Sequence, residues 1–550
     1  MPIVVKKVRR LGAGGGTAGG GGTTSSLRPE FAPKTPACSK ACPNHHDIRA
    51  ILTTISQAEA YGKSREEAFQ EAFYLLADKN PLPASTSRVC PHQCEIQCNR
   101  AHLDGSVSIH SLEHFLGDYA LEEGLPLRLL TEEHFPEKIA VIGSGPGGLS
   151  CAYQMARRGY AVTIFEAFPK LGGMLRYGIP AHRLPREILD AEIDRLLALG
   201  IEMRCGTAIG RDVAYDELRQ HYAAIFVGMR AQTGVRLGLP GDEAPNVLSA
   251  IEFLHRVNTG ENPAIGESAV VVGGGDVAVD AARVAVRLGA RTTMLFRKTL
   301  QEMPAGEPEV EEAQREGVRI ECLAVPSAVV TEGGRAMGLT CLRMETQEGG
   351  APGAAEFFVG ASTIIAAPKP ERDYTGLASL QDGSGRIPVD DLGETGVPNT
   401  FIGGDDLDLG IVSTALFRGR HAAETMHARF RGMPPDAVAA PPVIAHARMR
   451  LDYSPKQPRT ETATVPVAER LADPDREVNL GWSSDQAVTE TKRCLSCGLC
   501  FACDTCWKYC QEQAVLKPAS KGQPYRFKLD FCQGCKKCAE ECPCGYIEMR

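Results

Sequence analysis

The densest set of chemically reactive side chains lies in the last 60 residues, where two runs of cysteines repeat one spacing. Each run has the order Cys-x2-Cys-x2-Cys-x3-Cys, the ligand pattern of bacterial ferredoxins, in which the fourth cysteine binds the cluster of the other run. The spacing predicts two [4Fe–4S] clusters, and a zinc ribbon would not repeat it. The expected ligands are Cys500, Cys503, Cys506 and Cys542 for the first cluster, and Cys532, Cys535, Cys538 and Cys510 for the second.

A second group of cysteines lies near the N-terminus, in the motifs Cys-x3-Cys-Pro and Cys-Pro-x2-Cys-x3-Cys. Its members are Cys38, Cys42, Cys90, Cys94 and Cys98. Five thiols cannot complete two four-iron clusters. Cys494 and Cys497 form the remaining Cys-x2-Cys pair, and they stand just before the first ferredoxin run.

The first glycine-rich loop has the full context of a dinucleotide-binding unit. An apolar strand leads into Gly143-Ser-Gly145-Pro-Gly147-Gly148, a helix follows, and a second strand ends at Glu166. Gly143 would make the tight turn, Gly145 would let the backbone approach a pyrophosphate, and Gly148 would let the helix pack on the strand. Glu166 would accept hydrogen bonds from ribose hydroxyls. An ordinary glycine turn without a ligand is the alternative interpretation.

The same unit returns over residues 269–296. The expected cofactor contacts of its loop are Gly273, Gly275, Asp276 and Ala278. Where the first copy ends in Glu166, the second ends in Arg297 and Lys298. Two cations would pair with a 2′-phosphate that a carboxylate would repel, so the second unit is expected to bind NADP rather than NAD. The alternative is that these are ordinary exposed charges at a strand end.

A third glycine-rich element contains Gly404 and Asp405 and precedes a helical segment. Two loops of different charge followed by Gly-Gly-Asp are typical of flavoproteins with two dinucleotide domains. FAD is expected on the first loop, with Asp405 contacting it, and NAD(P)H on the inserted second unit. No Cys-x2-Cys stands near either loop, so a disulfide-reductase mechanism is not expected. The scattered thiols, expected to be buried and structural, are Cys151, Cys205, Cys322 and Cys341.

Residues 36–430 resemble the small subunit of bacterial glutamate synthase and the electron-entry half of dihydropyrimidine dehydrogenase. The matching stretches are residues 88–98, 108–115, 172–180 and 302–305. The resemblance implies a helical module that binds two [4Fe–4S] clusters with one non-cysteine ligand, which would be Glu113 here. It also implies that Gly173 belongs to the cofactor-binding set. The Cys-x2-Cys that this family carries before its first N-terminal pair is absent, and the pair Cys494 and Cys497 has the neighbours of that motif.

A count of ligands then yields a hypothesis. Four clusters need sixteen ligands, and two places in the N-terminal pair are open unless Cys494 and Cys497 reach back across the molecule. One N-terminal cluster would take Cys38, Cys98, Cys494 and Cys497, and the other would take Cys42, Cys90, Cys94 and Glu113. The alternative is that Cys494 and Cys497 merely flank the first ferredoxin run, which leaves three clusters or fewer.

These residues require a multidomain α/β chain with an all-α iron–sulfur module, two Rossmann-like units and a C-terminal ferredoxin-like domain. The expected divisions are a flexible glycine-rich basic tail (1–34), a helical cluster module (35–135), the first segment of the FAD unit (136–252), an NAD(P)H unit (253–370), the second segment of the FAD unit (371–432), a linker (433–490) and the ferredoxin-like domain (491–550).

Composition restricts the partners. The net charge of −8 gives no basic field for nucleic acid, no long apolar stretch predicts a membrane span, and no secretory signal is seen, so a cytoplasmic protein is expected. No residues are left for a substrate domain. We therefore expect an electron-transfer enzyme whose partner subunit, within a larger redox complex, does the substrate chemistry, with ferredoxin as a further partner.

The fused ferredoxin-like domain resembles that of the NADP-linked subunits of 2-oxoacid:ferredoxin oxidoreductases. The favoured function is therefore electron transfer between NADP(H) and a 2-oxoacid:ferredoxin oxidoreductase. The alternatives are a glutamate synthase small subunit, an electron carrier of sulfur metabolism, and a cluster-bearing sensor or scaffold without turnover.

Overall fold

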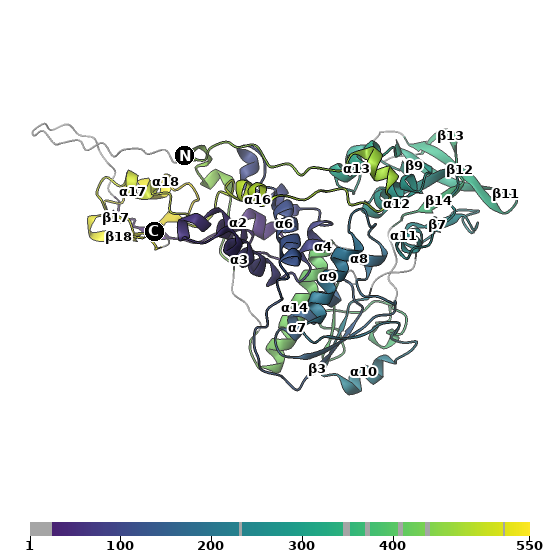
Figure 1. Ribbon diagram of the computed structural model, residues 1–550, viewed down its shortest axis with the longest axis horizontal. Coiled ribbons are helices and arrows are strands. Elements are labelled where there is room, and N and C mark those ends of the chain that lie inside the picture. Colours follow the sequence, from purple (N-terminus) through teal and green to yellow (C-terminus); the bar gives the residue numbers. More distant parts are fainter. Residues whose placement is uncertain are drawn as a thin grey trace, which may run out of the picture.

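The computed structural model describes residues 25–229, 234–344, 352–368, 374–404, 411–434, 440–520 and 523–550 (Figure 1). Two lobes hold the nucleotide units, and a third end of the molecule holds the N-terminal and C-terminal modules side by side. No helix among the described residues is both long enough and apolar enough to cross a membrane.

A five-stranded parallel sheet, in the order β15-β6-β3-β4-β5, forms the first nucleotide unit. Its strands are β3 (Lys138–Ile142), β4 (Ala161–Phe165), β5 (Glu202–Arg204), β6 (Ala224–Val227) and β15 (Thr400–Ile402). Its helices are α7 (Pro146–Ala156), α8 (Met174–Tyr177), α9 (Arg186–Leu197), α10 (Tyr215–His221) and α14 (Val412–Phe430). Because β15 joins the sheet beside β6 only after the second unit has been completed, that unit is an insertion, as the sequence predicts.

A second five-stranded parallel sheet has the order β10-β9-β8-β14-β7. Its strands are β7 (Val247–Ser249), β8 (Ser268–Val272), β9 (Arg291–Phe296), β10 (Arg319–Cys322) and β14 (Thr363–Ala366). The accompanying helices are α11 (Ala250–Asn258), α12 (Asp276–Arg287) and α13 (Glu307–Arg315), and an antiparallel sheet adds β11 (Ala324–Glu332), β12 (Arg335–Met344) and β13 (Pro352–Gly360). The two Rossmann-like sheets confirm the predicted fold class. The expected boundary at residue 253 is wrong, because β7 already pairs with β14.

The N-terminal module is helical, as predicted. Its helices are α1 (Ala37–Ala41), α2 (Ile48–Ser56), α3 (Arg65–Ala77), α4 (Pro83–Ser87), α5 (Gln93–Ile96) and α6 (Ile109–Glu122). Ile51, Phe69, Leu76 and Leu116 are almost fully buried in its apolar core. Thiols Cys38, Cys42, Cys94 and Cys98 lie against the same core.

The C-terminal module is small and has short elements. They are α17 (Thr505–Tyr509), β17 (Val515–Leu516), β18 (Arg526–Phe527), α18 (Lys537–Glu540) and β19 (Ile547–Met549). β19 pairs antiparallel with β1 (Pro29–Phe31), and the Phe31 ring stacks on that of Tyr546 at 5.2 Å. The predicted flexible tail is therefore wrong for residues 29–31, where apolar side chains find partners 500 residues away. Residues 1–24 of that tail lie outside the described residues.

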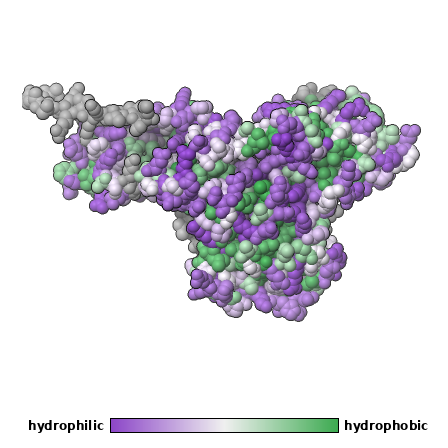
Figure 2. Space-filling model, in the orientation of Figure 1, coloured by the Kyte–Doolittle hydropathy of each residue, from purple (hydrophilic) through white to green (hydrophobic). Residues whose placement is uncertain are grey.

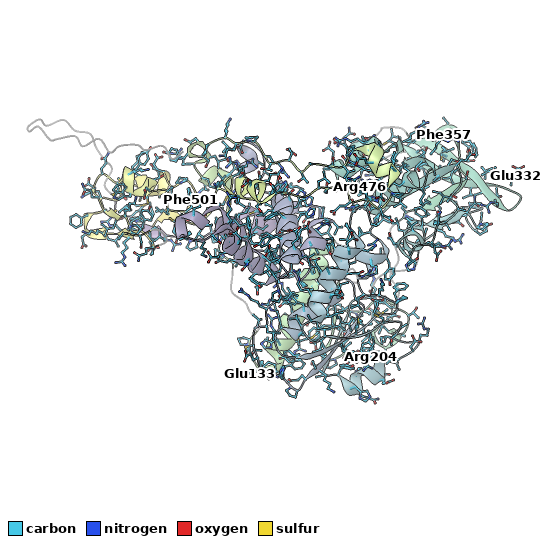
Figure 3. The ribbon with its side chains drawn as sticks, in the orientation of Figure 1. Glu133, Arg204, Glu332, Phe357, Arg476 and Phe501 are labelled. Carbon is cyan, nitrogen blue, oxygen red and sulfur yellow. The ribbon has the colours of Figure 1, made fainter. Side chains whose placement is uncertain are left out.

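Most of the predicted linker belongs to an ordered segment, residues 440–498, which we call the strap. It contains β16 (Val443–Ile444), α15 (Val467–Ala472) and α16 (Ser484–Thr491), and β16 pairs with β2 (Thr35–Pro36). Arg287 on α12 donates to the Arg470 carbonyl at 3.0 Å, so the strap contacts the second nucleotide unit. Figure 3 labels Arg476 beside that unit and Phe501 in the C-terminal module. The strap therefore links both ends of the molecule, and the expectation of a simple connector is wrong.

Candidate functional site

The first glycine-rich loop lies between β3 and the N-terminus of α7. A Cβ atom on Gly148 would stand 2.0 Å from the Gly143 carbonyl oxygen, so no larger residue fits there. Nothing lies within 4 Å of the Cβ position of Gly145, and the backbone at this point is open to a ligand. Gly173, with φ of 51°, lies against the loop, because its Cβ would be 2.6 Å from the Gly145 Cα atom. The loop, its helix N-terminus and Gly173 therefore suit a pyrophosphate.

Glu166 is buried at the end of β4 and orders this loop. The Ser144 backbone N–H donates to Glu166 Oε2 at 2.9 Å, and the Phe168 N–H donates to Oε1 at 3.0 Å. A carboxylate accepts about four hydrogen bonds. The Ser144 hydroxyl is a third donor, to Oε2, so Glu166 keeps the capacity to accept one more hydrogen bond, from a ribose hydroxyl, while it positions the loop.

The chain returns to this loop after the second nucleotide unit. A Cβ on Gly147 would lie 3.4 Å from both the Gly404 Cα and backbone nitrogen atoms. The structure thus places the third glycine-rich element against the first. Asp405 lies outside the described residues.

The second loop repeats the arrangement between β8 and α12. Gly273 has φ of 152°, and its Cβ would be 2.8 Å from the Ala367 carbonyl oxygen and 3.1 Å from Ala278 Cβ. Gly275 is open, as Gly145 is. Asp276 begins α12, and burial raises the pKa of its carboxyl group, an effect that Arg183 opposes.

Arg297 and Lys298 are exposed directly after β9, beside this loop. Lys298 Nζ lies 3.2 Å from Glu302 Oε1, whereas Arg297 has no carboxylate within ion-pair distance among the residues that the structure describes. Two cations at the C-terminal end of β9 suit the place where a dinucleotide ribose lies in such units.

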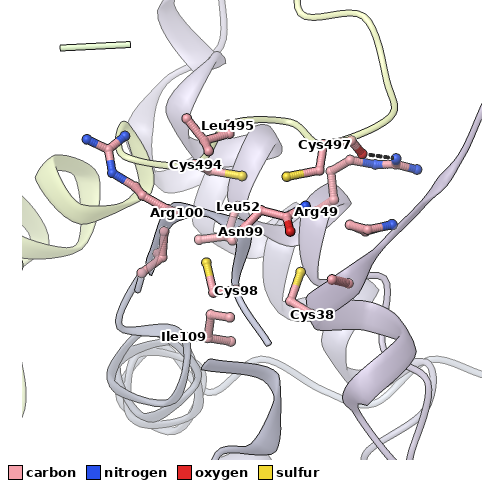
Figure 4. A pocket seen from close by; sticks show the side chains of 13 residues that line it. Cys38, Arg49, Leu52, Cys98, Asn99, Arg100, Ile109, Cys494, Leu495 and Cys497 are labelled. Carbon is pink, nitrogen blue, oxygen red and sulfur yellow. Dashed lines mark hydrogen bonds between the residues drawn. The ribbon is translucent and has the colours of Figure 1, made fainter. Parts of the chain in front are cut away.

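Four thiols from distant regions of the chain line one cavity at the base of the strap. Figure 4 shows the sulfur atoms of Cys38, Cys98, Cys494 and Cys497 directed toward one another. Burial and then repulsion by the other three thiols hold the pKa of Cys38 well above its usual value. A cluster with cationic iron would remove that penalty, because metal ligation stabilises thiolates.

A second group surrounds Glu113 on α6. Burial and the Glu113 carboxylate raise the pKa of Cys90 to about 12, and the same causes raise the pKa values of Cys42 and Cys94. The His46 Nδ1 atom lies 3.3 Å from Glu113 Oε1 and fixes this carboxylate. The structure thus brings together the four residues that the count of ligands assigns to one cluster, among them Glu113 from the family resemblance.

Contacts around Arg493 hold the end of the strap on the N-terminal module. Arg493 and Glu490 form an ion pair in which both side chains are fully buried. Glu490 also accepts from the Ser108 backbone N–H at 2.8 Å, and Arg493 donates to the Gly105 carbonyl at 2.8 Å. Arg49 on α2 donates to the Cys497 carbonyl at 2.7 Å. These bonds fix Cys494 and Cys497 beside Cys38 and Cys98.

The eight thiols of the ferredoxin runs lie in two groups with the same backbone geometry. Positive φ angles recur at Ala502 and Gly534, and again at Asp504 and Lys536. Amide N–H groups donate to four of the sulfur atoms at corresponding places. The acceptors are Cys500 (3.5 Å), Cys510 (3.2 Å), Cys532 (3.4 Å) and Cys542 (3.3 Å). Such bonds favour thiolate ligands.

The grouping of these eight thiols follows the predicted exchange of the fourth cysteine. Cys500, Cys503, Cys506 and Cys542 line one cavity. Burial and repulsion by the Cys532, Cys510 and Cys535 thiols raise the pKa of Cys538 to about 12. Among the described residues, no three His, Cys, Asp or Glu side chains converge closely enough to hold a single metal ion.

Comparisons with known proteins agree with this architecture. Residues 137–423 match the family model of pyridine nucleotide-disulphide oxidoreductases. Residues 31–125 match the model of dihydropyrimidine dehydrogenase domain II, a 4Fe–4S cluster domain. The chain belongs to the pyridine nucleotide-disulphide oxidoreductase family.

Curated relatives in this family span most of the chain. The beta subunit of NADP(+)-dependent formate dehydrogenase from Moorella thermoacetica is 34% identical over 508 residues, which cover 84% of this chain and 70% of that protein. The beta subunit of NADPH-Fe(3+) oxidoreductase from Geobacter sulfurreducens is 32% identical, with coverage of 84% and 75%. The glutamate synthase (NADPH) small chain of Escherichia coli is also 32% identical, with coverage of 71% and 87%.

The match to the glutamate synthase small chain and to dihydropyrimidine dehydrogenase domain II confirms the predicted resemblance. Membership of the pyridine nucleotide-disulphide oxidoreductase family confirms the predicted enzyme class. The chain is an NAD(P)H-dependent FAD oxidoreductase with an iron–sulfur module, rather than a sensor or scaffold without turnover. All twenty cysteines lie in the described residues, and none forms a disulfide. Of the four scattered thiols, Cys151 and Cys341 are fully buried, while Cys205 and Cys322 are partly exposed.

Cys544 was missed by the sequence analysis. It is 2% exposed and lines the same cavity as the first ferredoxin group, with its sulfur atom 3.7 Å from that of Cys542. Its position two residues after Cys542 is a sequence signal, but the ferredoxin pattern has no place for a fifth thiol. Glu490 and Arg493 were missed as well, because two oppositely charged residues three apart are common on exposed helices.

Proposed function

We propose that the chain is an electron-transfer subunit that passes electrons between NADP(H), FAD and four [4Fe–4S] clusters, to or from a catalytic partner subunit. The observation that carries the proposal is the grouping of all sixteen expected ligands into four sets of four. Each set consists of mutual neighbours in the fold. The chain also carries two glycine-rich loops in which the backbone at Gly145 and at Gly275 is open to a ligand.

The residues of the chain would bind and orient the cofactors. Gly145, Gly173 and the N-terminus of α7 would hold the FAD pyrophosphate, and Glu166 its ribose. A bound flavin takes up two electrons as a hydride and releases them singly to clusters. The second unit is held against the first by Arg183, whose Nη1 atom donates to Asp280 Oδ2 on α12 at 2.8 Å. The strap fixes the other side of that unit through Arg470.

NADP preference rests on Arg297 and Lys298. Arg297→Glu should remove a charge-assisted contact with the 2′-phosphate, which contributes on the order of 1.5–3 kcal/mol. Because about 1.4 kcal/mol corresponds to a factor of ten, the KM for NADPH should rise roughly 10-fold or more, and the KM for NADH should change little. Arg291→Glu, on an exposed arginine at the opposite end of β9, is the matched control. A wild type that prefers NADH, or a variant with unaltered preference, would contradict the assignment.

Anaerobic addition of NADPH tests the function itself. The flavin absorbance and the broad cluster absorbance should both bleach, and wild-type protein should contain about sixteen irons, four for each cluster. Bleaching of the flavin alone would show that electrons do not reach the clusters. An unchanged spectrum would refute the proposed function.

Two partner classes are supported by different observations. The fused ferredoxin-like domain favours a 2-oxoacid:ferredoxin oxidoreductase. The Moorella relative, which matches over 84% of this chain, favours a formate dehydrogenase catalytic subunit. A glutamate synthase partner is less well supported, because that small chain matches only 71% of this chain. Purification of the native complex, with assays of NADP reduction by 2-oxoacids and by formate, distinguishes these partners, and reduction by neither substrate would refute both.

A further inference from the structure

An exposed apolar patch lies on the C-terminal module beside the last group of thiols. Leu529 and Phe531 are 47% and 58% exposed, and Phe531 directly precedes Cys532 in the chain. Cys535 of the same group is itself exposed. A cluster held by this group would therefore reach the molecular surface, where the electron path to another protein is shortest. Figure 2 shows apolar side chains among hydrophilic ones at this end of the molecule.

Three exposed lysines lie on the same small module as the patch. Lys528 Nζ lies 5.4 Å from the centroid of the Phe531 ring, and Lys536 directly follows Cys535. Lys508 is exposed on α17, which packs beside α18. Within the described regions of the chain, none of these three lysines is within ion-pair distance of a carboxylate. Asp530 is the exposed acid between the two apolar residues.

The charge of this module differs from that of the whole chain. Residues 499–550 contain eight basic and six acidic residues, although the net charge of the protein is −8. A basic surface on an acidic protein attracts an acidic partner to one place and repels it from others. A few apolar side chains ringed by charges suit a transient encounter, whereas permanent subunit interfaces are larger and more apolar.

We propose that the surface formed by Leu529, Phe531, Lys508, Lys528 and Lys536 docks an acidic one-electron carrier protein of the ferredoxin class. The carrier would exchange single electrons with the cluster of the Cys535 group. This inference rests on the proposed function, because electrons must reach that cluster from NADPH. The permanent catalytic subunit would then bind elsewhere on the molecule.

The test uses the full-length protein with its cofactors and an acidic 2[4Fe–4S] ferredoxin as the probe. The second-order rate constant for NADPH-driven ferredoxin reduction is measured anaerobically at low and high salt. Lys528→Glu and Lys536→Glu should each lower it about threefold or more at low salt, and the effect should shrink at high salt because salt screens exposed charges. Lys138→Glu, at the exposed start of β3, is the matched control and should leave the rate unchanged.

Two further measurements separate the possible failures. Phe531→Ser should slow ferredoxin reduction at both salt concentrations, while NADPH bleaches the flavin and clusters of this variant at the wild-type rate. A basic acceptor, cytochrome c, should not be slowed by either lysine reversal. Unchanged ferredoxin rates in the lysine variants, or equal slowing by Lys138→Glu, would overturn the docking surface. Failure of NADPH to bleach the wild-type clusters would instead refute the proposed function.

Discussion

The two ends of the chain build thiol groups of the same kind in different ways. In the C-terminal module, eight cysteines within residues 500–542 form two groups, and the backbone geometry repeats between them. In the N-terminal module, one group is assembled from α1, the loop after α5, and the end of the strap. The contact between Arg49 and Cys497 spans 448 residues. Local spacing specifies the first kind of site, and tertiary packing specifies the second.

Buried charges hold Cys494 and Cys497 beside the thiols of the N-terminal module. Arg493 is fully buried, and its guanidinium contacts Glu490, Asp104 and backbone carbonyls of the N-terminal module. Removal of one member of a buried ion pair costs about 3–5 kcal/mol. The N-terminal group should therefore depend on residues near 490, while the C-terminal groups should depend mainly on their own ligands.

The largest expected effect is on the iron content of two truncated chains, which distinguish the N-terminal group that uses Cys494 and Cys497 from the C-terminal groups. A chain that ends at Gly498 keeps Cys494 and Cys497 and should retain about eight irons, whereas one that ends at Glu490 should retain about four, since each cluster has four irons. Iron and FAD are measured on anaerobically purified protein, and FAD shows that the nucleotide units are folded. Equal iron in the two truncated proteins would mean that Cys494 and Cys497 bind nothing.

A substitution on α6 should affect a single N-terminal group. Glu113→Ala removes one expected ligand and should lower the iron content by up to about four per chain, while Glu113→Cys should restore it, because a thiolate is the usual cluster ligand. Glu122→Ala, at the end of the same helix, is the control. Normal iron in Glu113→Ala, by elemental analysis and electron paramagnetic resonance, would remove Glu113 from the ligand set.

The smallest expected effect concerns Cys544. Its thiol lies 3.7 Å from the Cys542 sulfur atom and can donate a hydrogen bond to that ligand. Cys544→Ala should lower the potential of one C-terminal cluster by about 60 mV or less, because a hydrogen bond contributes about 1 kcal/mol and tenfold in a one-electron equilibrium is 59 mV. Cys544→Ser should restore most of it. A redox titration measures this potential. Loss of iron from Cys544→Ala, by elemental analysis, would instead make Cys544 a ligand.

The sequence predicted what local patterns encode. Both nucleotide units, the helical module and the ferredoxin groups follow from strand, glycine and cysteine spacing, since each of these features operates over a few tens of residues. The family resemblance supplied Glu113, which no spacing indicates. The pairing of Cys494 and Cys497 with the N-terminal thiols followed from a count of ligands and from the family motif whose neighbours this pair has.

The strap could not be predicted, because its buried residues are sparse. The buried residues Val465, Trp482 and Val488 are far apart in the sequence, with many polar residues between them. Arg470 is buried against two carboxylates, those of Glu312 on α13 and Glu316 at the C-terminal end of that helix. Such a segment has the composition of a linker. Its order comes from surfaces that other regions of the chain present. The same reason explains strand β1, whose partner is the last strand of the chain.

The central claim is that Cys494 and Cys497 complete an N-terminal cluster site. The most direct test is the iron content of full-length protein that carries Cys494→Ser and Cys497→Ser, purified anaerobically, with Cys205→Ser and Cys322→Ser as the matched control. The double variant should fall from about sixteen irons per chain to about twelve, at four per cluster, with FAD unchanged, and the control should keep all its iron. About sixteen irons in the Cys494 and Cys497 variant would contradict the account.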